Sequence, residues 1–253
     1  MRATDMTFTA HVGTRGEDVT MADPRFEQAL YEVPEAARLA RVPARSLWNW
    51  VRGYRYPTQR GLARAKPVIK TTADGKALSF INLSEVVALV GFRHAGVSMQ
   101  GVRKALDYVG REMNEQHPLA TKRILTDGAE LFWEYQHRRD SEFHLVNLSR
   151  GGQKVFRDTV LRYLRQIEWG PDRYAIRWWP GSNEAGKGDV VVDPRRAFGA
   201  PVLAGTGIRT EDVFDRFSAG EGLRLLARDY GLTIGQIEAA VRAEARFLEP
   251  IAA

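Results

Sequence analysis

The sequence predicts an α+β fold that is mostly α-helical, and three observations support this class. Hydrophobic residues recur at helical spacing near both ends of the chain, so both ends are predicted to be helical. Short apolar runs flank Asp-Gly pairs at residues 74–75 and 127–128, a pattern typical of antiparallel hairpins. With 253 residues, 44% of them hydrophobic, and six tryptophans, the chain can bury two or three small cores.

Four segments are expected along the chain. Residues 1–30 form a polar leader that we expect to be disordered, and residues 31–116 form a winged helix-turn-helix. Residues 117–188 form a mixed β/α middle segment with a linker, and residues 189–253 form a C-terminal module that again resembles a helix-turn-helix.

The charge is unevenly distributed over these segments, within a net charge of +6. From Arg41 to Lys76 there are nine basic residues and one acidic residue. From Lys187 to Glu249 there are nine basic and ten acidic residues. This asymmetry favours nucleic-acid binding at the front of the chain and protein contact at the back, with a solvated charged face as the alternative.

The N-terminal segment begins with two short helices. Residues 31–40 are predicted to be helical with Pro34 in the first turn, where its missing N–H costs nothing. After a turn at residues 41–43, a second helix over residues 44–52 would bury Leu47, Trp50 and Val51 and end at Gly53. Two short helices joined by a tight turn, the second of them basic, predict a helix-turn-helix.

A wing and two further helices are predicted next. The strands of the wing are expected at residues 67–72 and 76–80, around the Asp74-Gly75 turn. Helices follow at residues 83–92 and 98–111, and Ser98 is a plausible N-cap for the second.

This order of elements, with Ala95-Gly96-Val97-Ser98 leading into a helix that carries Val102-Arg103, resembles the DNA-binding domain of MerR-type regulators. The resemblance covers residues 31 to about 106. It departs at Trp48, where those regulators usually carry arginine, and at Pro118, which closes the last helix before a long dimerising helix could form. The resemblance therefore implies DNA binding but not the effector sensing or coiled-coil dimerisation of that family.

If the module binds DNA, the exposed side of its second helix would read bases through Arg45, Ser46 and Asn49. Arg45 suits guanine and Asn49 suits adenine, each worth about 1–3 kcal/mol of discrimination. Phosphates would be held by the other basic residues, namely Arg52, Arg55 and Arg60, with Lys70 and Lys76 on the wing. The alternative is that the helix-turn-helix serves only as a packing unit.

The middle segment is predicted to be rich in strands. A hairpin is expected over residues 124–133, a strand over 145–148, a helix over 155–167 and a strand over 174–179. The C-terminal module is predicted to contain three helices, over residues 210–217, 223–230 and 234–247, with Thr233 as the cap of the third. The first would bury Val213, Phe214 and Phe217, and the third shows an apolar stripe at Ile237, Ala240, Val241, Ala245 and Leu248.

The C-terminal module carries a recognisable pattern of glycines and small residues. The pattern is Gly-x-Pro-x-x-x-Gly-Thr-x-Ile, a glycine with an acidic follower, Asp-Tyr-Gly-Leu-Thr, and a helix ending Ala-Ala-x-Arg; here its residues are Gly199, Pro201, Gly205, Thr206, Ile208, Gly220, Glu221, Asp229 to Thr233, Ala239, Ala240 and Arg242. The segment resembles the C-terminal module of the DUF433 antitoxins, a branch of the VapB-type antitoxins of bacterial toxin–antitoxin pairs. It differs from many members in having Gly207 where they have arginine.

This resemblance implies a partner. Antitoxins of this type are typically paired with a PIN-like ribonuclease toxin whose active site is a cluster of carboxylates that binds Mg²⁺. An arginine could displace the metal ion or pair with the acids. The candidates by chemistry are Arg195, Arg196, Arg242 and Arg246, and the sequence does not choose among them.

Catalytic chemistry is not indicated. There are no cysteines, and the five histidines are scattered without the spacing of metal ligands. Residues 181–187 fit the first seven positions of a phosphate-binding loop, but Gly188 stands where Ser or Thr must hold magnesium. We therefore expect neither an enzyme nor a cofactor. No apolar run has the length of a membrane span, so we expect a soluble, cytoplasmic protein.

Two functions remain open. The first is a non-enzymatic antitoxin that binds and neutralises a PIN-like ribonuclease toxin, represses its own operon by binding operator DNA, and forms a homo-oligomer to read a symmetric site. The second is a stand-alone MerR-like regulator that responds to a small ligand. Its sensor would be an aromatic pocket in the middle of the chain, lined by Trp133, Tyr135, Trp169, Trp178 and Trp179.

Overall fold

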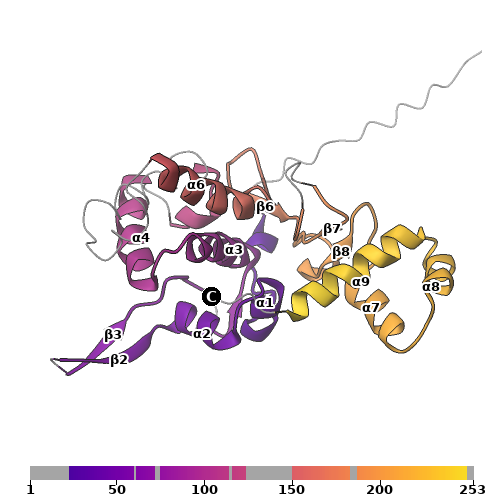
Figure 1. Ribbon diagram of the computed structural model, residues 1–253, viewed down its shortest axis with the longest axis horizontal. Coiled ribbons are helices and arrows are strands. Elements are labelled where there is room, and N and C mark those ends of the chain that lie inside the picture. The colour runs from indigo at the N-terminus through magenta and orange to yellow at the C-terminus, as the bar shows by residue number, and fades with distance from the viewer. Residues whose placement is uncertain are drawn as a thin grey trace, which may run out of the picture.

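The computed structural model describes residues 23–59, 61–71, 75–113, 116–123, 150–182 and 187–249. Within these ranges, helices predominate and the strands form small two-stranded antiparallel sheets, which confirms the mostly helical α+β class. The hairpin expected over residues 124–133 and the strand over 145–148 lie outside the described residues. Figure 1 shows an elongated molecule with a β-hairpin at one end and the helices α7 and α8 at the other.

The predicted helix-turn-helix is present, with one correction at its start. Helix α1 (Val33–Leu39) has Pro34 in its first turn, and helix α2 (Ala44–Arg52) buries Leu47, Trp50 and Val51 as expected. Residues 31–32 were expected to be helical, but they form strand β1 (Tyr31–Glu32), which pairs with β4 (Ala77–Leu78). The pairing continues with the N–H of Leu30, which donates to the carbonyl of Leu78. Backbone partners from a distant segment therefore delay the start of the helix to Val33.

The wing lies elsewhere than predicted. It is formed by β2 (Tyr54–Thr58) and β3 (Gly61–Ala65), which pair antiparallel directly after α2. The hairpin expected around Asp74-Gly75 is wrong, because the backbone N–H groups of Val68 and Ile69 donate to the Trp50 carbonyl and Ile69 is fully buried. Residues 77–78 then pair with β1 instead of with this segment. Long-range pairing thus overrides the local turn signal.

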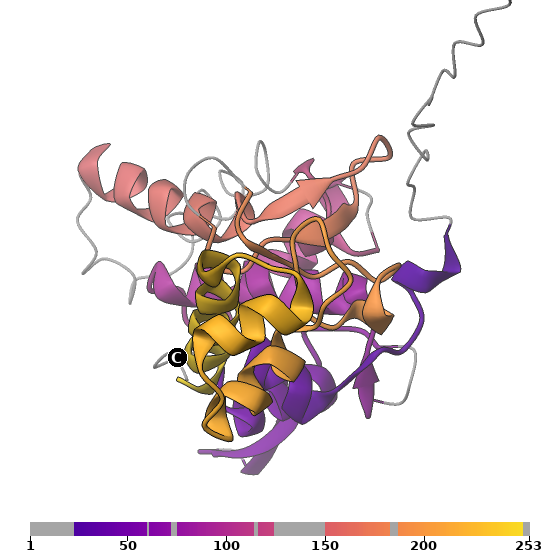
Figure 2. The ribbon, with the colours of Figure 1, turned by 90° about the vertical axis from the view of Figure 1, so that its right-hand side faces the viewer.

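Helix α3 (Phe80–His94) lies at the centre of the molecule and is buried along almost its whole length. Its N-terminus carries a capping box between Ser79 and Asn82. Helix α4 (Met99–Met113) follows, and the Ser98 hydroxyl accepts from the N–H of Gly101 as the predicted cap. Helix α6 (Arg150–Leu164) packs along α3, as Figures 1 and 2 show.

The helix predicted over residues 155–167 differs at both ends. Helix α6 begins earlier, at Arg150, and ends at Leu164, so that Ile167 opens β5 (Ile167–Trp169), which pairs with β6 (Ala175–Trp178). The N–H of Trp179 donates to the carbonyl of Gln166, which draws the chain into the sheet directly after the helix.

The C-terminal module starts with short elements: β7 (Val190–Val191), the 3-10 turn η5 (Ala197–Gly199) and β8 (Val202–Leu203). Three helices follow, α7 (Thr210–Ser218), α8 (Leu223–Tyr230) and α9 (Ile234–Leu248). The predicted bounds of α8 and the Thr233 cap of α9 are confirmed. Gly231 has φ 65°, a left-handed conformation that favours glycine at the end of a helix.

Burial in this module differs from the prediction in two helices. Phe217 of α7 was expected in the core but is 37% exposed, while Val213 is fully buried. On α9, Ala245 and Leu248 of the predicted stripe are exposed, and the buried side includes Ala243, Glu244 and Phe247 instead. The reason is that α9 contacts α1 near its C-terminal end as well as α7 and α8, so its buried face follows neighbours in both modules.

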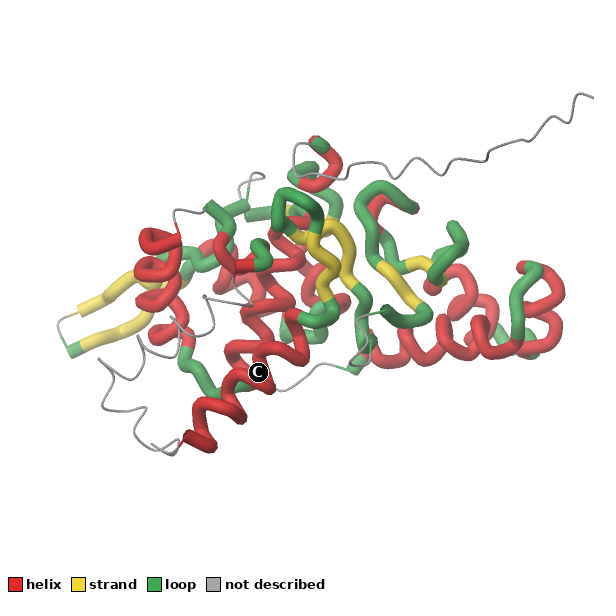
Figure 3. Tube along the Cα trace, turned by 90° about the horizontal axis from the view of Figure 1, so that it is seen from above, coloured by secondary structure: helices red, strands yellow, loops and turns green. Residues whose placement is uncertain are grey.

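Buried residues of all segments form one connected core. The Tyr31 hydroxyl donates to the buried Gly199 carbonyl of the C-terminal module, 2.9 Å away. Residues 23–30, which the sequence assigned to a disordered leader, belong to the fold, because Phe26 is fully buried and packs edge-on against Phe80 with ring centroids 5.8 Å apart. The tube in Figure 3 shows α9 extending from the small sheets toward α7 and α8.

Candidate nucleic-acid interface

Helix α2 presents a polar row on the side away from its buried face. Arg45, Asn49 and Arg52 are spaced by four and three residues, so they lie along one face of the helix. Arg45 and Arg52 are exposed, and Asn49 and Ser46 are half-buried. Arg45, Asn49 and Arg52 can therefore reach outward as a row, and Ser46 lies beside this row.

Trp48, the residue that departs from the MerR pattern, has a structural role on this helix. Its ring is half-buried, and the Arg52 guanidinium lies 4.0 Å from the ring centroid. The Nε of Arg52 also donates to the Gly75 carbonyl at 3.3 Å. This cation–π contact and hydrogen bond hold Arg52 at the end of α2, against Trp48 and Gly75.

The wing has two chemically different faces, which follow from its register. Arg55 lies directly opposite Arg64, and residues directly opposite each other in an antiparallel pair point to the same side. Tyr54 and Tyr56 alternate with Arg55 and therefore occupy the other side. One face of the wing is basic, and the other is aromatic and turned toward α4, where Arg103 lies 5.3 Å from the Tyr54 ring centroid.

Gly53 fixes the wing close to the end of α2. It has φ 72°, and a Cβ at this position would lie 2.2 Å from the carbonyl oxygen of Ala65. Only glycine allows the two backbones to approach this closely. The basic row of α2 and the basic face of the wing are thus held next to each other.

The structure places the other predicted phosphate contacts differently. Lys70 and Lys76 are exposed but are not on the wing, because the wing is formed by β2 and β3. Arg60 lies outside the described residues. Arg64 was not among the predicted contacts, although the alternation Tyr-Arg-Tyr before the turn and Ala-Arg-Ala after it could have identified it.

Of the four arginines proposed to meet a partner, Arg195 is already engaged. Its guanidinium pairs with the buried carboxylate of Asp193 at 2.6 Å, and Arg177 reaches the same carboxylate at 2.9 Å. Burial alone would favour the neutral acid, but the hydrogen bonds from Arg195 and Arg177 hold the pKa of Asp193 below its ordinary value. Arg195 therefore stabilises the loop before η5.

The other three arginines are more accessible. Arg196 is exposed, with a long 3.4 Å hydrogen bond to the Thr206 carbonyl. Arg242 is exposed and lies 3.3 Å from Glu238, one turn earlier on α9. Arg242 and Arg246 line the same cavity of about 170 Å³, beside Gly181 and Lys187. The structure brings these two together, and neither Arg195 nor Arg196 lines that cavity.

The aromatic pocket of the alternative hypothesis is not assembled by the described residues. Trp178 is buried and packs on Phe247, with ring centroids 6.5 Å apart. The Trp179 indole N–H donates to Glu168 at 3.1 Å. Trp133 and Tyr135 lie outside the described residues.

Within the described ranges, no helix is both long enough and apolar enough to cross a membrane. In the same part of the chain, no three His, Asp or Glu side chains are grouped so that they could hold a metal ion.

Two known families match separate parts of the chain. Residues 29–106 match a family described as "Putative DNA-binding HTH domain". Residues 190–242 match a family described as "Protein of unknown function (DUF433)".

Whole-length relatives come from Mycobacterium tuberculosis. A protein named "Putative antitoxin VapB45" is 36% identical over 232 residues, which cover 87% of this chain and 95% of that protein. A second protein, named "Uncharacterized protein Rv2308", is 24% identical and covers 85% of this chain and 90% of its own length. The crystal structure of Rv2018 superposes with a TM-score of 0.62 and 28% identity, over 86% of this chain and 99% of that one. With its helix-turn-helix domain ahead of a DUF433 domain, the chain belongs to the family of the VapB45 antitoxin.

Proposed function

We propose that this chain is an antitoxin that binds and neutralises a ribonuclease toxin and represses its own operon by binding operator DNA. The observation that carries the proposal is the basic surface formed by α2 and the arginine face of the wing. It lies at one end of the elongated molecule, and α7 and α8 of the DUF433 module lie at the other (Figure 1). The two ends can therefore serve two partners at once, and the role is regulatory rather than catalytic.

The DNA half of the proposal assigns two kinds of contact. Arg45, Ser46 and Asn49 on α2 reach base edges in the major groove, where Arg45 suits guanine and Asn49 suits adenine. Phosphates are contacted by the basic residues around this helix, namely Arg52, Arg55, Arg60, Arg64, Lys70 and Lys76. If about six phosphates are neutralised, the logarithm of affinity falls against the logarithm of salt concentration with a slope near −5.

The matching experiment measures binding of the full chain to its own promoter fragment and to unrelated DNA at several salt concentrations. Asn49→Ala is expected to lose about 1–3 kcal/mol for the operator and little for unrelated DNA, because it removes a base contact only. Arg228→Gln at the far end of the molecule is the control and is expected to bind as the parent does. A flat salt response would remove the repressor half of the proposal.

The toxin half rests on the relative's name and on the arginines of the DUF433 module, of which Arg196 and Arg242 are exposed and Arg246 is half-buried. We infer that Arg242 and Arg246 meet carboxylates of the partner, with Arg196 as a further contact, because a guanidinium pairs with acids through two charge-assisted hydrogen bonds. Arg195 is the weakest of the four candidates, since Asp193 already holds it. The partner's class, a PIN-like nuclease, comes from the family resemblance of the C-terminal pattern.

The experiment is co-expression with the neighbouring gene product, followed by the intact mass of the complex and a ribonuclease assay. A stable complex without ribonuclease activity is expected, and a homo-oligomer of the antitoxin should be visible in the same mass measurement. Arg242→Glu with Arg246→Glu should restore ribonuclease activity, whereas Arg228→Glu should not. A chain that purifies alone in the presence of the neighbouring protein would contradict the toxin half and leave DNA binding to be judged separately.

A further inference from the structure

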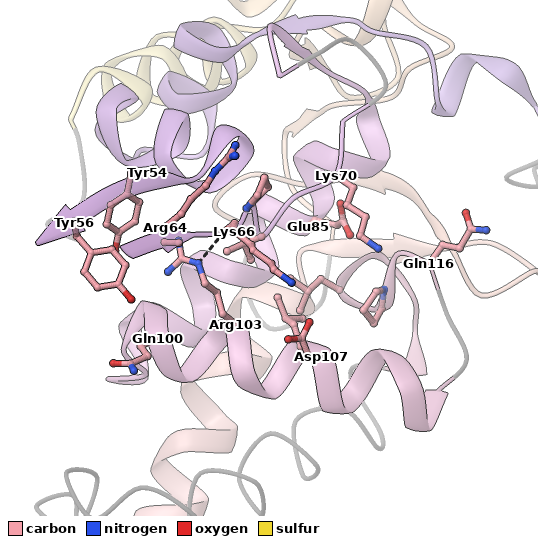
Figure 4. A pocket seen from close by; sticks show the side chains of 16 residues that line it. Tyr54, Tyr56, Arg64, Lys66, Lys70, Glu85, Gln100, Arg103, Asp107 and Gln116 are labelled. Atoms are coloured by element: carbon pink, nitrogen blue, oxygen red, sulfur yellow. Dashed lines mark hydrogen bonds between the residues drawn. The ribbon is translucent and has the colours of Figure 1, made fainter. Parts of the chain in front are cut away.

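A cavity of about 810 Å³ lies between the wing and α4. Figure 4 shows that it is bounded by the tyrosines of β2, by residues 66–70 after β3, and by the exposed side of α4. Cavities of this size are typical of sites for small organic molecules. The polar row of α2 (Arg45, Asn49 and Arg52) does not contribute to the lining of this cavity, and neither do the arginines of the C-terminal module.

One wall of the cavity is aromatic. Tyr54 and Tyr56 lie on the same face of β2, with ring centroids 5.8 Å apart and planes tilted by 51°. They are 38% and 39% exposed, so both rings present free surface on the side of the wing that is turned toward α4. Aromatic rings of this kind offer a stacking surface to a planar molecule.

The opposite side of the cavity carries positive charge that is only partly used. The Nε of Arg103 donates to the Lys66 carbonyl at 2.9 Å and its Nη1 donates to the Met99 carbonyl at 3.2 Å. Its Nη2 is buried and has no hydrogen-bond partner among the described residues. A buried donor of a charged group that lacks a partner is costly, and a small shift of the guanidinium toward the cavity would let an anionic oxygen there satisfy it.

The other charged side chains that line the cavity leave its net charge positive. Lys66 and Lys70 line the cavity with Arg103, and Figure 4 shows the three side chains turned into the same space. The acid Glu85 is engaged by the Asn82 amide at 3.1 Å and by His117 at 3.3 Å. Asp107, an exposed acid on α4, and Arg64 of the wing complete the charged lining.

We propose that this cavity is a binding site for a planar aromatic molecule that carries a carboxylate, sulfonate or phosphate group. The ring lies against Tyr54 and Tyr56, and the anionic group accepts from Nη2 of Arg103 beside Lys66. Because the tyrosines belong to the wing and Arg103 belongs to α4, the bound molecule bridges the wing to the body of the helix-turn-helix module. The site lies apart from the arginines of the C-terminal module and from the polar row of α2, but it shares Arg64 and Lys70 with the phosphate contacts of the proposed function.

The test is titration calorimetry of the full chain with 2-naphthalenesulfonate as the probe and the uncharged 2-naphthalenemethanol for comparison. Saturable binding of one sulfonate per chain is expected, with the uncharged molecule about tenfold weaker or more because it cannot pair with Arg103. No saturable heat up to about 1 mM sulfonate, the weak end of specific binding, would overturn the proposal. Equal affinities for the two molecules would overturn it as well.

Variants locate the site without disturbing the fold. Tyr56→Leu and Lys66→Gln change exposed side chains, and each should weaken binding of the probe several-fold. Arg103→Gln is less informative, because it also removes the hydrogen bond to the Lys66 carbonyl that positions the end of β3. Matched controls are Leu62→Ala, which is 75% exposed on the other face of the wing, and Arg165→Gln, a charge removed from the end of α6. Losses as large in the controls as in Tyr56→Leu and Lys66→Gln would place the probe elsewhere and refute the assignment.

Hydrogen exchange provides a second readout that does not depend on calorimetry. If the probe bridges the wing to α4, the backbone amides of residues 54–58 and 61–65 should exchange more slowly in its presence. Unchanged exchange in the wing at saturating probe would contradict the bridging geometry.

Discussion

Glu244 on α9 accepts a hydrogen bond from the Arg38 guanidinium on α1 at 2.7 Å, across 206 residues of sequence. The Glu244 side chain is only 3% exposed, and its second oxygen accepts from the Thr210 hydroxyl of α7. The Arg38 guanidinium also lies 5.8 Å from the centroid of the Phe247 ring. The first helix of the DNA-binding domain is therefore joined to the last helix of the DUF433 domain through one buried carboxylate.

Replacing Arg38 should destabilise the whole chain. Arg38→Met leaves Glu244 buried without its cation, and the expected loss in the free energy of unfolding is about 2–4 kcal/mol. Urea denaturation followed by circular dichroism measures it. The double variant Arg38→Met with Glu244→Met should recover much of the loss, because it removes the uncompensated charge. A double variant no more stable than Arg38→Met would show that the buried charge is not the cause.

An exposed pair provides the control for this prediction. Arg242 and Glu238 are 60% and 44% exposed at their side chains, so Arg242→Met should change the free energy of unfolding by less than about 1 kcal/mol.

Two glycines of the DUF433 pattern should respond differently to the same substitution. Both have positive φ, 80° at Gly199 and 77° at Gly205. A Cβ at Gly199 would lie 2.3 Å from the Tyr31 hydroxyl oxygen, whereas at Gly205 no atom lies within 4 Å. Gly205→Ala should cost about 1 kcal/mol from backbone strain alone, and Gly199→Ala about 1–3 kcal/mol more because it also breaks the buried hydrogen bond from Tyr31.

Thermal or urea unfolding of the two glycine variants, with Tyr31→Phe as a third, measures this difference. The extra loss at Gly199 should resemble the loss in Tyr31→Phe. Equal losses at the two glycines would mean that the contact between the modules contributes nothing measurable.

Arg64 on the basic face of the wing should act through the DNA backbone, given the proposed function. Arg64→Gln is expected to weaken operator and unrelated DNA alike and to reduce the magnitude of the salt slope by about 1, because one phosphate contact is lost. Fluorescence anisotropy at several salt concentrations measures both. Loss of operator binding alone, with the slope unchanged, would instead assign Arg64 to base recognition.

His117 should make stability depend on pH near neutrality. The buried carboxylate of Glu85, 3.3 Å from Nδ1 of His117, raises the pKa of His117 above its ordinary value, against the opposing effect of burial, and Glu27 adds to the rise while Lys70 reduces it. The protonated form is thus favoured in the folded chain. Its stabilisation is fully present below about pH 6.5 and is lost as the pH rises through the raised pKa.

The measurement compares the parent chain with His117→Gln in urea between about pH 5.5 and 8.5. The parent should exceed the variant by more at the acidic end, and the gap should narrow toward the alkaline end. A gap that stays constant over this range would contradict the assigned coupling between His117 and Glu85.

Local sequence patterns were sufficient for several of the helix ends. Thr233 caps α9, Gly53 ends α2 and Pro34 lies in the first turn of α1, as predicted from residue type alone. These features depend on the backbone conformation and hydrogen bonds of a few neighbouring residues, so they can be read without the rest of the chain. The pattern of the DUF433 module likewise led to the correct family.

The position of the wing could not be obtained in this way. Asp74-Gly75 is the stronger local hairpin signal, yet the hairpin forms at Tyr54–Ala65, because residues 68–69 bond to α2 and residues 77–78 pair with β1. Arg64 was missed and Lys70 and Lys76 were misplaced for the same reason. Strand partners distant in sequence are decided by the packing of the whole domain.

The sequence by itself thus determined which segments are helical, where the charge lies and which family the chain belongs to. The tertiary structure alone decided that Glu244 meets Arg38, that Tyr31 meets Gly199, and that the tyrosines of the wing line a cavity against α4. Contacts between residues up to 208 positions apart follow from how the helices pack, and no local periodicity encodes them.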